Sequence, residues 1–142
     1  MSGRTDPPIA DAEQGIWQGR SVARRFVSPD GFTVLVGRSA ADNDLLTFKL
    51  GEPRDGWLHV AAGSGSHVIV RNPEGLERMP RDTLRFAAAL AARYSKARHG
   101  GSVTVHVATC ADVSKPRGLP PGKVQLRRFS SVQVSPSRDD SA

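Results

Sequence analysis

Short segments of alternating apolar and polar residues recur along this chain, a pattern typical of half-buried β-strands. Six predicted strands cover residues 22–27, 32–36, 57–60, 67–71, 103–107 and 123–134. Two other segments predict helices. Residues 40–50 follow a potential N-cap at Ser39, and residues 81–98 repeat apolar side chains at a spacing of 3.6. The predicted element order is therefore ββαββαββ.

The connections between these segments indicate how the strands pair. Residues 28–31 read Ser-Pro-Asp-Gly, a sequence that favours a tight turn between neighbouring strands. Short turns of this kind imply antiparallel pairing, so the pattern predicts an α+β fold in which both helices cover one face of an antiparallel sheet. Phe129 is out of phase with Val124 and Leu126, which predicts a β-bulge near residues 127–128 of the last strand.

The two strands at residues 57–60 and 67–71 carry the most distinctive side chains. If they pair as a hairpin, Leu58, Val60, Val68 and Val70 face the core, and the opposite face carries Trp57, His59, His67, Ile69 and Arg71. One interpretation is an RNA-binding patch, with bases stacked on Trp57 and a phosphate held by Arg71. The alternative is that the tryptophan packs in the core and the histidines form local hydrogen bonds.

Charge strengthens the RNA interpretation. The 142 residues include 20 Lys and Arg against 14 Asp and Glu, a net charge of +6, which favours an anionic partner. Arg81, Arg85, Arg93 and Lys96 share one side of the second predicted helix, where they form either a solvated face or a phosphate-binding stripe. The length suits one domain, which we place at residues 19–134 between disordered tails at 1–18 and 135–142.

Several classes of function are disfavoured. No apolar run is long enough to span a membrane and residues 1–12 carry no secretory h-region, so we expect a cytoplasmic protein without a membrane partner. The single cysteine, Cys110, argues against a cysteine-based zinc site, and the histidine spacing matches no metal motif. His59 and His67 leave an RNA-processing or hydrolytic enzyme as a third alternative. We expect no enzyme activity, cofactor, metal or small-molecule substrate.

Five segments, in order, resemble the NFACT-R domain. They read GRSAADNDLLTF at 37–48, DGWLH at 55–59, GSHVIVR at 65–71, AARYSKAR at 91–98 and VSKPRGLPPGKV at 113–124. In that family the domain is the C-terminal RNA-binding part of ribosome quality-control factors. The resemblance implies a stand-alone RNA-binding module that binds tRNA or ribosomal RNA during rescue of stalled ribosomes, with the large ribosomal subunit as a further candidate partner. A protein-interaction module that docks on a ribosomal protein or a partner factor is the alternative.

The resemblance and the helix stripe together define the candidate RNA-binding residues. The family pattern includes Asn43 and Asp44, whose polar side chains inside a predicted helix indicate either buried hydrogen bonds or partner contact. The complete candidate set is Arg38, Asn43, Asp44, Asp55, Trp57, His59, Ser66, His67, Arg71, Arg85, Arg93, Lys96, Lys115 and Lys123. Ser95 also matches the family pattern.

Overall fold

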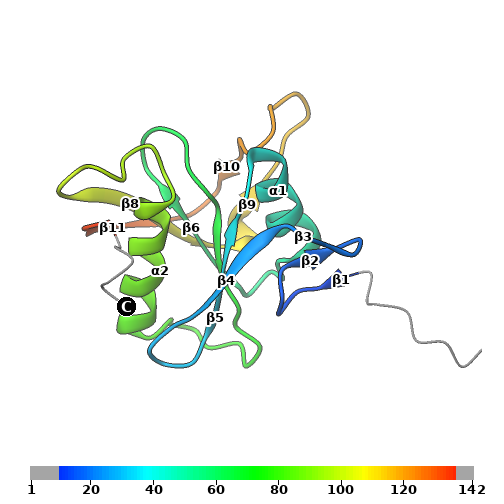
Figure 1. Ribbon diagram of the computed structural model, residues 1–142, viewed down its shortest axis with the longest axis horizontal. Coiled ribbons are helices and arrows are strands. Elements are labelled where there is room, and N and C mark those ends of the chain that lie inside the picture. Colours follow the sequence, from blue (N-terminus) through cyan, green and yellow to red (C-terminus); the bar gives the residue numbers. More distant parts are fainter. Residues whose placement is uncertain (1–9, 137–142) are drawn as a thin grey trace, which may run out of the picture.

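A six-stranded antiparallel sheet forms the centre of the computed structural model, which describes residues 10–136 (Figure 1). In spatial order its strands are β11 (Ser130–Val134), β8 (Val103–Thr109), β6 (Gly56–Val60), β7 (Val68–Val70), β5 (Thr33–Gly37) and β4 (Ala23–Val27). With two helices beside this sheet, the predicted α+β class is confirmed. Pairing of Trp57 with Ile69 and of Leu58 with Val68 confirms the hairpin of β6 and β7.

The helices lie on opposite faces of the sheet, so the prediction that both cover one face is wrong (Figure 1). Helix α2 (Arg81–Arg93) packs against Val34, Val36 and Leu58, whereas Leu35, Trp57 and Ile69 point to the other side. That second core is shared with the segment of α1 (Ala40–Leu45) and the π-helical η1 (Leu46–Leu50). Because helices and strands cover both faces of β5, every residue of this strand is buried.

The first helical segment has the predicted start. Ser39 is extended, and its Oγ accepts a hydrogen bond from the backbone N of Asp42 at 3.1 Å. The segment also ends at the predicted residue, Leu50, but its second half is a π-helix, in which the N of Gly51 donates to the oxygen of Leu46.

The second helix is shorter than predicted and ends at Arg93 instead of residue 98. Beyond it the chain pairs with the loop between β6 and β7: the N of Ser66 donates to Tyr94 O, and the N of Lys96 donates to Ser64 O. A Cβ on Gly65 would lie 2.6 Å from the Cβ of Ser95, so only glycine permits this close approach. Pairing with the loop replaces the last turn of the expected helix.

The start of the predicted domain and its predicted last strand both need correction. Residues from Ala10 onward, placed in the expected N-terminal tail, form a small antiparallel sheet of β1 (Ala10–Asp11), β2 (Ile16–Trp17) and β3 (Arg20–Ser21). Trp17 packs against the second core. The expected last strand is two strands: β10 (Gln125–Leu126) pairs with β9 (Val113–Ser114), which follows the short η2 (Cys110–Asp112), whereas β11 pairs with β8. The β-bulge predicted near residues 127–128 is replaced by a break between β10 and β11. Residues 1–9 and 137–142 lie outside the described part of either tail.

Candidate nucleic-acid interface

Two adjoining hollows lie where α1 begins and α2 ends. The larger, about 620 Å³, is the basic hollow, lined by Ser66, Arg93, Tyr94, Lys96 and Arg98 among others. The smaller, about 340 Å³, is the histidine pocket, lined by residues that include Trp57, His59, His106 and Lys123. The two share Ala40, Asn43, Ser64 and Gly65, so they lie side by side on either side of one wall.

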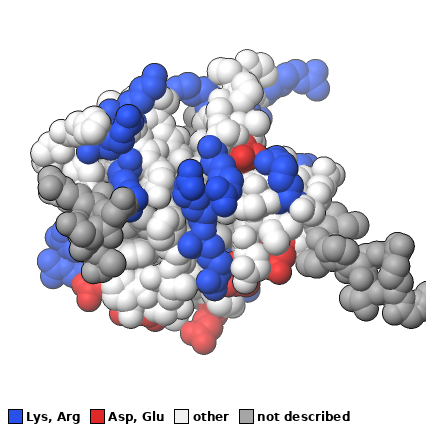
Figure 2. Space-filling model, viewed as in Figure 1, with Lys and Arg blue, Asp and Glu red and all other residues white. Residues whose placement is uncertain are grey.

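Cationic side chains gather around the basic hollow. In Figure 2, Lys and Arg side chains cluster over β4 and around the C-terminal end of α2, and most acidic side chains lie toward the lower margin. The guanidinium carbons of Arg24 and Arg93 lie 5.4 and 5.0 Å from the centre of the Tyr94 ring. Contact with the ring restrains both guanidinium groups, which favours binding of anions at this end of α2.

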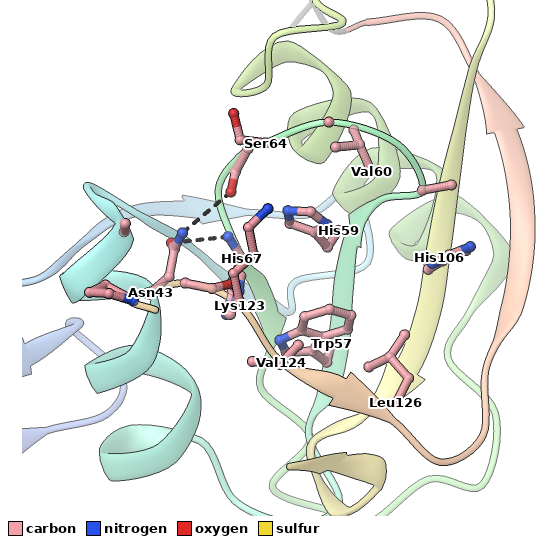
Figure 3. Close-up of a pocket in the computed structure, with 16 residues that line it drawn as sticks. Asn43, Trp57, His59, Val60, Ser64, His67, His106, Lys123, Val124 and Leu126 are labelled. Carbon is pink, nitrogen blue, oxygen red and sulfur yellow. Dashed lines mark hydrogen bonds between the residues drawn. The ribbon is translucent and has the colours of Figure 1, made fainter. Parts of the chain in front are cut away.

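The histidine pocket combines aromatic rings with polar groups (Figure 3). His59 and His106 are direct neighbours across β6 and β8, and the ring of His59 stacks on Trp57 with centroids 5.9 Å apart. Burial lowers the pKa of His59, which keeps its imidazole neutral at pH 7. A neutral imidazole offers one hydrogen-bond donor and one acceptor.

Asn43 holds the wall between the hollows. Its Oδ1 accepts a hydrogen bond from the backbone N of His67 at 3.0 Å, and its Nδ2 donates to Gly65 O at 3.3 Å (Figure 3). A Cβ on Gly37 would lie 1.9 Å from this Oδ1, so the asparagine depends on that glycine for its position. The side chain thereby fixes the loop that separates the two hollows.

A chain of hydrogen bonds lies beneath the histidine pocket. The Trp57 Nε1 donates to Thr47 Oγ1 at 3.2 Å, and the same oxygen lies 2.8 Å from His67 Nδ1. The His67 Nε2 lies 3.0 Å from the carbonyl oxygen of Gly122, which can only accept, so Nε2 carries the proton and Nδ1 accepts from the threonine. Burial lowers the pKa of His67 to about 4, which matches this neutral form.

The loop of residues 115–123 packs against His67 and is held there by Asp44. The Asp44 carboxylate accepts from the N of Gly122 at 3.2 Å and pairs with Lys115 Nζ at 3.1 Å. Lys115 also donates to the carbonyl oxygens of Pro120 and Lys123. These contacts place the backbone of residues 121–124 along the rim of the histidine pocket.

Arg71 lies in a separate buried cluster. Its Nη1 pairs with Asp55 Oδ2 and its Nε pairs with Glu13 Oε2 at 3.0 Å. The other carboxylate oxygen of Asp55 accepts from the N of Asn72 at 2.9 Å. The guanidinium is therefore paired with the buried carboxylate of Asp55 and the exposed carboxylate of Glu13, and the structure gives it a role in folding.

A model of one protein family, described as the NFACT protein RNA binding domain, matches residues 23–128, well over half of the chain. The chain belongs to the NFACT-R family. The resemblance to the NFACT-R domain seen in the sequence is thus confirmed.

Proteins similar to this NFACT-R chain include the Rqc2 homolog RqcH of Bacillus subtilis, 36% identical over 118 residues, and that of Streptococcus suis, 37% identical over 122 residues. These matches cover 83% and 84% of this chain but only 20% and 21% of the relatives, so the chain spans about a fifth of their length. Ribosome quality control complex subunit 2 of Saccharomyces cerevisiae is 36% identical over 72 residues, 51% of this chain and 7% of that protein.

A solved structure shows the same fold. It is the C-terminal part of the fibronectin/fibrinogen-binding protein from Streptococcus suis, with a TM-score of 0.78 and 33% sequence identity. The match covers 86% of this chain and 48% of that chain. Within residues 10–136, no helix is long and apolar enough to cross a bilayer, and no three His, Cys, Asp or Glu side chains converge as a metal site.

The structure places the sequence-predicted residues in several different environments. Around the hollows lie His59, Ser66, Arg93, Lys96 and Lys123, and Arg38 is exposed near the start of α1. Asn43, Asp44, His67 and Lys115 instead hold the walls, as the bonds above show, and Asp55 and Arg71 lie in their own cluster. Arg85 is exposed on α2 outside both hollows.

The prediction that bases stack on Trp57 is wrong, because only 2% of this residue is exposed. The prediction that Arg71 binds a phosphate is also wrong, because the carboxylates of Asp55 and Glu13 already pair with its guanidinium. Sequence reasoning missed Arg24, Tyr94, Arg98 and His106. A partial signal existed for His106, a polar residue on a predicted half-buried strand, but only the register of β6 and β8 places it beside His59.

Proposed function

We propose that this NFACT-R chain binds RNA, either tRNA or ribosomal RNA, through the basic hollow, and that it acts in ribosome quality control as a binding module. The observation that carries the proposal is the group of cations around one hollow in a domain of an RNA-binding family. The names of its relatives supply the ribosomal context.

The geometry suits the backbone of a nucleic acid. Arg24 and Arg93 flank Tyr94, and Lys96 and Arg98 follow it along the chain, so four cations lie within one short stretch of surface. Phosphates repeat along a strand at a spacing that such a row can follow, and each neutralised phosphate releases counterions. Binding should therefore depend steeply on salt.

A salt titration with tRNA tests the proposal. Replacing both Lys96 and Arg98 by alanine should weaken binding and lower the slope of log K against log salt by roughly 1.4 to 1.8, two phosphate contacts. Arg78 gives a matched control. It is exposed and precedes α2, whose 13 residues place it about 20 Å from the hollow. Arg78→Ala should leave the slope unchanged.

Two results would count against the proposal. One is the absence of tRNA and ribosomal RNA binding at low salt. The other is an equal loss of slope in the Arg78 control and the Lys96 and Arg98 variant, which would show only a diffuse attraction. Arg85→Ala measures how far the binding surface extends along α2, since Arg85 lies about two turns before Arg93.

A further inference from the structure

An exposed pair of aromatic rings borders the histidine pocket. The centroids of His106 and Phe129 lie 4.3 Å apart with the ring planes inclined by 45°. Phe129 is 52% exposed, the highest value among the exposed large apolar side chains of residues 10–136. A phenyl ring held against a second ring and left open to solvent is a surface on which a further flat group can stack.

The pair lies on a part of the sheet that no helix covers. His106 pairs with His59 on one side and with Ser131 on the other, so these three side chains share the face that carries Trp57. Toward β7 and β5 this face is buried beneath α1 and η1. Toward β11 it is open, since Ser131 and Gln133 are exposed.

We propose that the histidine pocket and this aromatic pair receive one unpaired nucleotide of a bound RNA, an inference that rests on the proposed function. The pocket, about 340 Å³, is of a size that suits a single small group, and its lining mixes aromatic faces with polar atoms from His59, Ser64 and Lys123. A base in a duplex is stacked and paired, and only an unpaired base can present both its face and its edge.

The wall shared by the two hollows indicates how a bound RNA could pass from one hollow to the other. Asn43, Ser64 and Gly65 line both hollows, so an RNA backbone beside Lys96 and Arg98 can direct a base over this wall toward His106. The wall is held in place by Asn43, and the floor by Trp57 and His67. Because the site is formed before binding, little ordering of the protein opposes entry of the base.

Two RNAs test the inference: a fully paired duplex, and the same duplex with a single-stranded 3′ overhang of about four nucleotides. The full chain should bind the overhang RNA more tightly, by about 5- to 150-fold for one stacked base. Phe129→Ala and His106→Ala should abolish the preference without changing the salt slope, because no cation is lost. Phe129→Tyr should retain it. Phe48→Ala is the matched control, since Phe48 is 37% exposed on η1.

Cross-linking provides a second readout that does not depend on any variant. A photoreactive base in the overhang should attach to the segments that contain His106 or Phe129. If both RNAs bind equally to the wild type, or if Phe129→Ala keeps the full preference, the inference fails while the proposed function stands. If neither RNA binds at low salt, both fail. Cross-links confined to the basic hollow would also overturn the inference.

Discussion

Mild acid should destabilise this domain mainly through His67. Its side chain is 1% exposed, and the neutral ring satisfies both of its nitrogens, with Thr47 on Nδ1 and Gly122 O on Nε2. A second proton would disrupt the bond at Nδ1 and place a charge in the interior. Burial therefore lowers the pKa of His67 from its ordinary 6.5 to about 4.

The direction and size of this change in stability follow from the linkage between proton binding and folding. The unfolded chain binds this proton near pH 6.5 and the folded chain only near pH 4, so between these values the unfolded state binds more protons and stability falls as the pH falls. The stability contributed by the neutral His67 ring is fully present above about pH 6.5. Between pH 7 and pH 5 it should decrease by about 2 kcal/mol, and by pH 4 by about 3 kcal/mol.

Urea unfolding at pH 7 and pH 5 measures the effect. For a urea dependence of about 2 kcal/mol per molar, the midpoint of the wild type should fall by about 1 M. His67→Gln can still donate to Gly122 O, and it should lose correspondingly less between the two pH values. Some loss remains because burial also lowers the pKa of His59. Measurements stop at pH 5 so that carboxylates with lowered pKa values, such as Glu13, stay ionised.

The same substitution at the exposed His99 controls for removal of an imidazole as such. An equal loss of stability in the wild type and in His67→Gln would refute the reasoning. If the variant does not fold, NMR titration of the wild type decides the question, because the His67 ring signals should stay constant from pH 7 to pH 5. A midpoint of titration near pH 6.5 would show that burial does not keep the ring neutral.

Two further predictions concern residues that the sequence had assigned to RNA. Trp57→Ala should lower the free energy of unfolding by about 3–5 kcal/mol, since it removes a buried indole and the donor to Thr47. A loss of RNA affinity with unchanged stability in urea unfolding would contradict it. Arg71→Met should cost about 3 kcal/mol or more, because it leaves the buried Asp55 carboxylate without its cation. Adding Asp55→Asn should recover part of that loss, and a lower RNA salt slope at unchanged stability would refute the assignment.

Local sequence patterns predicted the helices and strands of this fold, but they predicted less well which of these elements contact one another. Alternation along residues 57–60 and 67–71 predicted the hairpin and which side chains share a face, because side-chain direction follows from strand geometry. The same pattern could not show what covers the face of Trp57. That cover is formed by residues 40–50 and by the distant loop 115–123, which Asp44 holds through Gly122.

The candidate site shows the same limit. Residue type indicated RNA binding for Arg71 and Lys96 equally, but partners decided the outcome: Arg71 pairs with Asp55 and Glu13, whereas Lys96 is exposed at the basic hollow. Glu13 lies in a segment without apolar periodicity, so nothing in the sequence connected it with Arg71. Tyr94 and Arg24 are far apart along the chain and meet only because β4 lies near the end of α2.

The small sheet of β1, β2 and β3 determines where this domain can be cut. A fragment limited to residues 23–128, the span of the family match, would lose Glu13 and leave one nitrogen of the buried Arg71 without its carboxylate. It would also lose Trp17 from the second core. At the other end it would omit β11, which exposes the backbone of β8 as a new sheet edge. Expression of this domain for crystallography or RNA titration should therefore begin no later than Ala10 and extend through Val134.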